Sequence, residues 1–228
     1  MLNFSPGGPV EEKRKEFVAE LKQLYEAILK GDAGLATSVV KEALDQGTDP
    51  EKLVYENMVP AMDEVGRRFE NNEYFVPELL ISARAMKAAL GIIQPLLVSK
   101  GAKPAGSVVI GTVAGDLHDI GKNLVAAIME GGGFRIHDLG VDVTVEEFLA
   151  AVKEHQPDIV AMSALLTTTM SVMKNVVEAL KQNGLRDGTK VLIGGAPVTQ
   201  QFAEEIGADG YSDNAAGAVR EARAWVAG

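Results

Sequence analysis

The chain has 228 residues, of which 46% are hydrophobic and 24% are charged, a composition typical of soluble globular proteins. Its formal net charge of −10 argues against a general binder of nucleic acids or anionic membranes, because phosphates require a basic surface. The chain contains no cysteine, which excludes disulfides, thiolate metal sites, iron–sulfur clusters and cysteine nucleophiles. The N-terminal residues are charged and no hydrophobic run is long enough to span a membrane, so we expect no signal peptide and a cytoplasmic protein.

The N-terminal half predicts a helical domain over residues 10–100. Residues 1–9 contain paired glycines between prolines and are expected to form a flexible arm. Four segments then carry hydrophobic residues at three- and four-residue spacing: 10–31, 34–46, 50–69 and 76–100. Pro60 is expected to kink or divide the third of them. Short turns join the segments, which is the pattern of a four-helix bundle.

The C-terminal half predicts an α/β domain over residues 107–228. Residues 101–106, Gly-Ala-Lys-Pro-Ala-Gly, are expected to form the linker between the two domains. Strands are expected at 107–113, 134–138, 159–163, 190–194 and 210–212, and helices at 120–130, 145–155, 168–183, 200–206 and 215–226. This alternation is typical of a doubly wound, five-stranded parallel sheet of the Rossmann-like or flavodoxin-like kind.

Titratable residues gather where the first strand of the predicted sheet ends. Asp116, His118 and Asp119 lie in that loop, and open α/β sheets bind ligands at the carboxyl ends of their strands. A lone loop histidine is most often merely solvated, but a carboxylate that accepts its Nδ1 proton leaves Nε2 as a free ligand. Without partners at zinc spacing, His118 suits a metal already held by a macrocycle. The alternative is a metal phosphohydrolase, which needs further histidines, and His137 and His155 are not in a matching context.

Two further strand ends carry unusual residues. Residues 163–169 follow the third strand, and Gly194 and Gly195 follow the fourth. Each signal is weak alone, because a threonine run is typical of a helix N-cap and paired glycines are typical of a tight turn. The glycines at 131–133 join a helix to a strand and do not form a dinucleotide-binding fingerprint. In a doubly wound sheet, the three loops are expected to face one ligand.

Together these residues resemble the cobalamin-binding domain of methionine synthase and of corrinoid methyl-carrier proteins. The family signature is D-x-H-x-x-G, then S-x-L, then G-G, and residues 116–121, 163–165 and 194–195 match it at the family's spacing. Residues 65–69, 74–79 and 82–87 also look like the family's helical cap. The resemblance covers residues 10–228.

The resemblance implies a role for each matching residue. His118 would replace the cofactor's own benzimidazole as the lower ligand of cobalt, which is the base-off, His-on state. Asp116 would hold the imidazole, Thr169 would complete a hydrogen-bond relay, and Ser163 would meet the displaced nucleotide tail. The cofactor would be methylcobalamin or a related corrinoid. Further implied contacts are Gly115, Leu117, Asp119, Ile120, Gly121, Leu165, Thr167, Gly194, Gly195, Asp213, Ala215 and, over the upper face, Phe75.

The resemblance also implies a carrier function. The protein would receive a methyl group on cobalt from a donor-side methyltransferase and pass it to an acceptor-side methyltransferase, and a reductive activase would be a further partner. Donors such as methylamines, methanol or aryl methyl ethers, and acceptors such as tetrahydrofolate or a thiol, remain open. The chain lacks a substrate barrel, which takes about 250 residues, so we expect a carrier subunit that is not a complete enzyme. The hinge for cap movement would be the linker at residues 101–106.

Three alternatives remain at this point. The first is a cobalamin-dependent regulator or light sensor, which normally adds a DNA-binding helical domain. The second is the small subunit of an adenosylcobalamin isomerase, which usually lacks a cap of this kind. The third is a flavodoxin-like protein that holds another cofactor or none, which the three-part signature disfavours.

Overall fold

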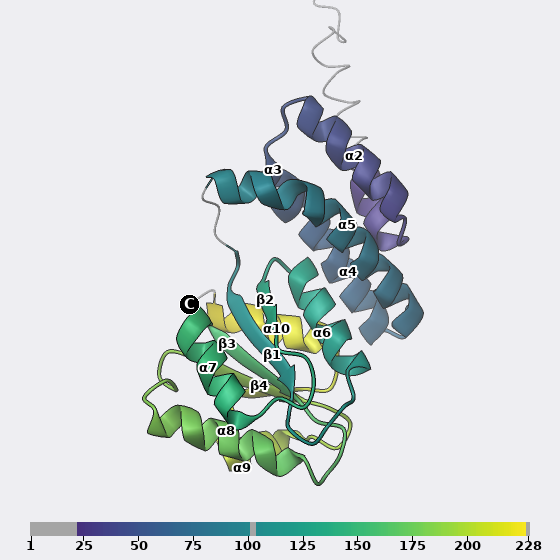
Figure 1. The fold of residues 1–228 in the computed structure, drawn as a ribbon. Coiled ribbons are helices and arrows are strands. Elements are labelled where there is room, and N and C mark those ends of the chain that lie inside the picture. Colours follow the sequence, from purple (N-terminus) through teal and green to yellow (C-terminus); the bar gives the residue numbers. More distant parts are fainter. Residues whose placement is uncertain (1–21, 101–103, 227–228) are drawn as a thin grey trace, which may run out of the picture. The chain divides into compact units, whose positions relative to one another are not determined.

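The computed structural model describes residues 22–100 and 104–226. Three predicted segments lie wholly or partly outside the described residues. They are the arm at residues 1–9, the beginning of the first helix and half of the linker. The chain divides into two compact units, Met1–Ala102 and Lys103–Gly228, each of which is described by itself (Figure 1).

The described part of the first unit is helical throughout. Residues 22–29 form a helix, and three longer helical runs follow. They are α2 (Ala33–Asp45), then α3 (Pro50–Lys52) with η1 (Leu53–Met58) and α4 (Val59–Glu70), then α5 (Val76–Lys100). Helix α5 packs against both α2 and α4. These four runs agree with the four helices predicted from the hydrophobic spacing.

The third run contains the distortion that Pro60 predicts. Proline has no N–H group to donate and its ring crowds the preceding turn, so a regular α-helix cannot continue through it undisturbed. The structure places the π-helical segment η1 directly before this point, and the N–H group of Val59 donates to the carbonyl of Val54, five residues back. The helical run therefore widens ahead of the proline and continues as α4.

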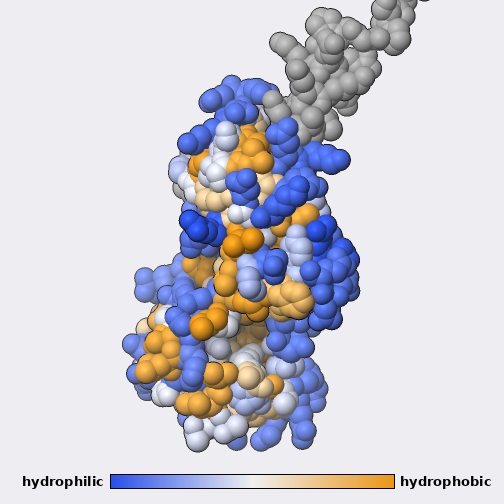
Figure 2. Space-filling view, turned by 90° about the vertical axis from the view of Figure 1, so that its right-hand side faces the viewer, coloured by the Kyte–Doolittle hydropathy of each residue, from blue (hydrophilic) through white to orange (hydrophobic). Residues whose placement is uncertain are grey.

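Helix α5 buries one stripe of side chains and exposes another. Leu79, Met86 and Ile93 are buried at a spacing of seven residues, as expected for the core side of a helix. Val76 and Leu80 are large hydrophobic side chains that remain exposed on the same helix. In Figure 2, hydrophobic side chains reach the surface of the molecule in patches separated by hydrophilic ones.

The second unit is built on a five-stranded parallel sheet with the order β2-β1-β3-β4-β5. The strands are β1 (Ser107–Thr112), β2 (Arg135–Asp138), β3 (Ile159–Ser163), β4 (Lys190–Gly194) and β5 (Gly210–Ser212). The strand order reverses between β1 and β3, which is the flavodoxin-like form of the doubly wound fold. The predicted fold class is therefore confirmed.

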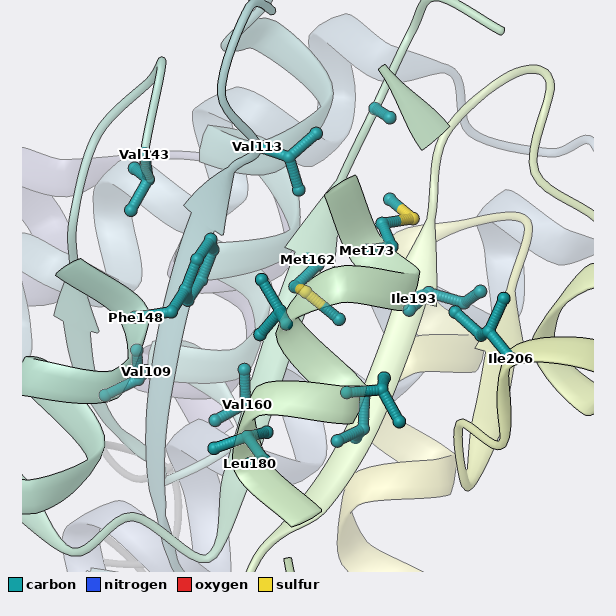
Figure 3. Close-up of a cluster of buried hydrophobic side chains, with 14 of the residues drawn as sticks. Val109, Val113, Val143, Phe148, Val160, Met162, Met173, Leu180, Ile193 and Ile206 are labelled. Atoms are coloured by element: carbon teal, nitrogen blue, oxygen red, sulfur yellow. The ribbon is translucent and has the colours of Figure 1, made fainter. Parts of the chain in front are cut away.

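Helices cover both faces of the sheet (Figure 1). They are α6 (Ile120–Gly131), α7 (Val145–His155), α8 (Met170–Gln182), α9 (Gln200–Ile206) and α10 (Ala215–Val226). Helices α6 and α10 pack together on one face, and α7, α8 and α9 lie on the other. Figure 3 shows the core beneath the second group, where Phe148 of α7 lies against β1. Gly111 makes room for this ring, because a Cβ atom there would lie 3.0 Å from Phe148 Cζ.

The register of the strands brings the three predicted loops to one edge of the sheet. Thr112, Ser163, Gly194 and Ser212 are aligned across β1, β3, β4 and β5. Each of them is the last residue of its strand. The loops that follow β1, β3 and β4 therefore start side by side at the carboxyl edge, where such sheets bind ligands. Within the described residues, no helix combines the length and hydrophobicity needed to cross a bilayer.

Candidate functional site

The side chain of Asp116 connects the loop after β1 with the loop after β3, and it is fully buried. Its Oδ1 atom accepts a hydrogen bond from the backbone N–H of His118 at 3.1 Å and lies 2.7 Å from Nδ1 of the His118 ring. Its Oδ2 atom accepts from the N–H groups of Leu165 at 2.7 Å and Leu166 at 3.2 Å, and from the hydroxyl of Thr169 at 3.0 Å. One carboxylate therefore fixes the histidine and the neighbouring loop together.

These hydrogen bonds keep Asp116 ionised. Burial by itself would raise the pKa of this carboxyl, because it disfavours the charged form. The hydrogen bonds from Leu165, from the ring and backbone of His118 and from Thr169 outweigh that effect and hold the pKa well below its usual range. A carboxylate that stays charged favours the tautomer of His118 that carries its proton on Nδ1. Nε2 is then the nitrogen with a lone pair for a metal.

The imidazole of His118 is presented at the surface. Its side chain is 53% exposed, although its Asp116 partner is buried. The hydroxyl of Thr112 donates to the carbonyl of His118 at 2.9 Å, which fixes the backbone beneath the ring. The hydrophobic neighbours Leu117 and Ile120 are 73% and 74% exposed. The site thus offers one nitrogen ligand in an apolar surrounding, which suits a large, mostly hydrophobic ligand.

Thr169 stands at the N-cap position of α8, but its hydroxyl is directed to Asp116 and does not cap the helix. The helix was expected to begin at residue 168, but α8 begins at Met170, and Thr169 at the N-cap position makes no side-chain capping bond. Its hydroxyl instead contacts the carbonyl of Leu166 at 2.8 Å as well as Asp116. Asp116 attracts the hydroxyl away from the helix end. Thr167 is exposed at the same loop, and Ser163 is half-buried at the end of β3.

Gly194 and Gly195 are required by the chain itself. A Cβ atom on Gly195 would lie 1.9 Å from the carbonyl oxygen of Ala164, and its φ of +129° is in the region that side chains disfavour. A Cβ atom on Gly194 would lie 2.9 Å from the carbonyl oxygen of Ser212. The close approach of β4 to both neighbouring strand ends explains the pair, so the glycines are not independent evidence for a ligand.

Gly121 and Gly115 also belong to the predicted site, but no backbone of a neighbouring strand crowds them as it crowds Gly194 and Gly195. A Cβ atom on Gly121 would have nothing within 4 Å, and its φ is not positive, so nothing in the described part of the chain requires glycine there. Gly115 has a φ of +81° and belongs to a tight turn, in which its N–H donates to the carboxylate of Asp142 at 2.7 Å. Open space above Gly121 is consistent with the close approach of a group from outside the chain.

The end of β5 completes the row of loops. Asp213 is exposed there, whereas the side chain of Ala215 is buried at the start of α10. The hydroxyl of Ser212 donates to the carbonyl of Asn214 at 2.6 Å, and the amide oxygen of Asn214 accepts from the N–H of Gly217 at 2.8 Å. The structure therefore brings Asp213 to the carboxyl edge, and it brings only the backbone of Ala215 there.

Phe75 belongs to the first unit, where it precedes α5. Its side chain is 61% exposed, and its backbone N–H donates to Oε2 of Glu78 at 2.9 Å. Because the two units are described separately, a place for Phe75 over a cofactor stays a prediction.

Sequence reasoning missed several residues that hold the His118 loop in place. Asp142 accepts from Gly115, and its own N–H donates to the carbonyl of Asp116 at 3.0 Å. Lys122 is buried in the first turn of α6 and pairs with Asp138 at the end of β2. The available signal was position, because Asp138 is the last residue of a strand that ends at this edge and Asp142 lies in the loop after it. Among the described residues, no three histidine or carboxylate side chains gather as a metal site.

Family models match both halves of the chain. A B12 binding domain matches residues 106–220, and a second B12 binding domain model matches residues 20–94. The trimethylamine corrinoid protein 2 of Methanosarcina mazei is 42% identical over 213 residues, which cover 92% of this chain and 96% of that protein. The dimethylamine corrinoid protein of Methanosarcina barkeri is 40% identical over 209 residues, which cover 91% of this chain and 97% of that protein.

Solved structures of relatives share this fold. A chain in the methanol:cobalamin methyltransferase complex MtaBC from Methanosarcina barkeri is 30% identical with a TM-score of 0.82, and the match covers 100% of this chain and 95% of that one. A cobalamin-binding protein from Desulfitobacterium hafniense is 36% identical with a TM-score of 0.75, and the match covers 90% of this chain and 98% of that one. The chain therefore belongs to the family of corrinoid proteins with B12-binding domains, and its cofactor is a corrinoid.

Proposed function

We propose that this protein binds its corrinoid in the base-off, His-on state and carries a methyl group on cobalt between two methyltransferases. The observation that supports the proposal most directly is the contact of His118 Nδ1 with the buried carboxylate of Asp116 at 2.7 Å, which leaves Nε2 for the metal. The residues present fit a corrinoid in two further respects. Leu117 and Ile120 are exposed hydrophobic side chains on either side of the histidine, and the space above Gly121 is open.

When bound, a corrinoid supplies a cobalt ion that can accept and release a methyl group. The part of this chain is to control the proton on His118. The charged carboxylate of Asp116 would hold the proton on Nδ1 of His118, so that Nε2 would be the nitrogen that holds the metal. Thr169 has one hydroxyl hydrogen and two acceptors, Asp116 and the carbonyl of Leu166, so it can adjust its donation as the charge of the pair changes.

The nucleotide tail of the corrinoid would occupy the carboxyl edge between the loops after β3, β4 and β5. Ser163 and Gly194 end neighbouring strands there, and Leu165 and Thr167 are exposed in the loop between β3 and α8. Gly195 lets the loop between β3 and α8 lie against the end of β4. Asp213 follows β5, the last strand in the order of the sheet. The buried side chain of Ala215 leaves only its backbone for such a contact.

The names of the relatives support methyltransferases as partners. Those names are trimethylamine and dimethylamine corrinoid proteins, and the solved complex is a methanol:cobalamin methyltransferase. We infer that a donor-side methyltransferase loads the methyl group and an acceptor-side methyltransferase removes it, with tetrahydrofolate or a thiol as the acceptor. A reductive activase would restore the cofactor after oxidation. Phe75, which is exposed in the first unit, would shield the upper face until the cap moves aside.

The test is reconstitution of the cofactor-free protein with hydroxocobalamin, followed by gel filtration and an ultraviolet–visible spectrum. The wild type should retain the corrinoid with the spectrum of a nitrogen-ligated, base-off form. His118→Ala should lose that lower-ligand signature, and His155→Ala is the matched histidine control, because His155 lies at the end of α7. A wild type that elutes without corrinoid, or a His118→Ala spectrum identical to the wild-type spectrum, contradicts the proposal.

The second candidate, a cobalamin-dependent regulator or light sensor, would pass this binding test. The carrier and the sensor are distinguished by loading the protein with methylcobalamin and then adding an acceptor-side methyltransferase with its acceptor. A carrier loses its methyl group to the acceptor in the dark, whereas a sensor retains it until it is illuminated.

A further inference from the structure

A buried lysine stands at the first turn of α6, directly after the signature glycine. Lys122 is 3% exposed and is the one buried lysine among the residues that the structure describes. Burial disfavours a charged ammonium group, and the N-terminal turn of a helix is the end at which a positive charge is least stable. Both factors oppose the position of Lys122, so its partners must compensate for them.

Those partners use the full donor capacity of the ammonium group. Nζ of Lys122 lies 2.6 Å and 2.5 Å from the two carboxylate oxygens of Asp138 and 2.7 Å from the amide oxygen of Asn123. Asp138 is the last residue of β2, and its Oδ1 atom also accepts from the N–H of Gly140 at 2.9 Å. The ion pair therefore ties the first turn of α6 to the carboxyl end of a strand.

The same contacts continue to the residue beside His118. The side-chain amide of Asn123 donates to the carboxylate of Asp119 at 3.0 Å, and its backbone N–H donates to the carbonyl of Asp119 at 2.7 Å. On the other side, Thr112 holds the carbonyl of His118. The backbone of His118 is thus held between a β1 residue and a chain of contacts that ends at the Lys122–Asp138 pair.

We propose that Lys122 and Asp138 form a positioning pair that sets where the His118 imidazole presents Nε2 to the metal. This inference rests on the proposed function, because it requires His118 to be a ligand. The side chain of Lys122 is buried, whereas that of Asp138 is 38% exposed. Neither exposed nor buried ion pairs contribute much net stability, so stability alone does not account for the pair. Residues that orient a metal-binding histidine from behind change metal affinity about 10- to 100-fold when they are replaced.

The test compares the ligation of His118 in variants of this pair. Each protein is loaded with hydroxocobalamin, and the visible spectrum is followed as the pH is lowered until the histidine leaves the cobalt. Protonation competes with ligation, so weaker ligation moves the midpoint to higher pH. Lys122→Met and Asp138→Asn should each raise the midpoint by about one pH unit, the equivalent of about tenfold weaker ligation. Lys122→Arg, which retains the charge, should keep the midpoint close to the wild-type value.

A double variant separates positioning from folding. Lys122→Met combined with Asp138→Leu leaves no unpaired charge, so it should fold even if the single variants do not. We expect its midpoint to remain raised and the amides of residues 118–122 to exchange hydrogen faster in the cofactor-free protein. Lys190→Met is the control, because Lys190 pairs with Asp209 at the opposite edge of the sheet.

The outcomes distinguish this inference from the function on which it rests. A wild type that shows no His118-dependent spectrum overturns both. A wild type with the expected spectrum, together with a double variant whose midpoint and exchange rates equal those of the wild type, overturns the positioning pair alone.

Discussion

Two carboxylates lie at opposite edges of the sheet, Asp116 fully buried and Asp209 half-buried, and their partners differ in kind. Asp209 precedes β5 at the amino edge, where its oxygens contact Arg186 at 2.6 Å and Lys190 at 3.3 Å and accept from the N–H of Val191 at 2.7 Å. Asp116 at the carboxyl edge has N–H and hydroxyl donors and a histidine ring.

The two sets of partners indicate different roles for the two edges. At the amino edge, the negative charge is matched by two permanent cations, which is a structural arrangement. At the carboxyl edge, the charge is stabilised by dipoles, and its one titratable partner is the exposed His118. The charge of Asp116 is therefore balanced by groups without a fixed positive charge, whereas the charge of Asp209 is balanced by two cationic side chains.

The largest effect is expected for Asp116→Ala. It leaves the N–H groups of His118, Leu165 and Leu166 without the carboxylate that accepts from them, so the free energy of unfolding should fall by about 4 kcal/mol. Urea unfolding of the cofactor-free protein measures this loss. A loss under about 1 kcal/mol would show that other groups replace the carboxylate.

Asp209→Asn should have an intermediate effect and should leave the cofactor site intact. Arg186 and Asp209 each have a side-chain exposure of 17%, and Arg186 keeps contacts with the carbonyls of Thr189 and Gly207. We expect the free energy of unfolding to fall by about 2 kcal/mol while the corrinoid spectrum is unchanged. If this variant altered the spectrum as Asp116 variants do, the two edges would not be independent.

Acid should weaken the wild type more than Asp116→Asn. The pKa of Asp116 is held below its ordinary value of 3.8, so its contribution to stability is complete at neutral pH and is lost as the pH falls below that value. Between pH 7 and pH 3, the difference in free energy of unfolding between wild type and Asp116→Asn should shrink by about 1 kcal/mol. Urea titrations at both pH values measure it, and a constant difference would contradict the lowered pKa.

The smallest change in stability is expected for Gly121→Ala. The added Cβ atom meets nothing within 4 Å and the position is helical, so the variant should be more stable by about 0.5 kcal/mol. Corrinoid retention should nevertheless decrease, because the cofactor would lie against this glycine. Gly188→Ala is the control at the amino edge, where space is also open, and it should leave retention unchanged. Equal retention in both variants would count against close approach at Gly121.

Most of the fold could be predicted because hydrophobic spacing and turn residues agree in this chain. The predicted bounds of β3, β4 and β5 are those of the structure, and β1 ends one residue early, at Thr112, with Val113 in an isolated bridge to Val143. The widening before Pro60 was predicted only as a kink or a break. Whether the helix kinks, breaks or widens depends on which carbonyl oxygen the N–H groups of that turn can still reach. The local sequence does not determine this.

The site was predictable where residues lie close together in the sequence. Asp116 and His118 are two positions apart, and their contact follows from that spacing. The contacts of Asp138 with Lys122 and of Asp142 with Gly115 depend on the neighbouring strands β1 and β2, so they emerge only from the fold. Gly194 and Gly195 were ambiguous for the same reason, because the carbonyls they approach belong to other strands.

The sheet also ends in its two shortest strands. Four residues of β2 form one border and three residues of β5 form the other. Unpaired backbone groups on a long border invite strands from other molecules, and such association leads to aggregates. Here each border offers little length for pairing. The sheet therefore offers little backbone to which a strand of another molecule could pair.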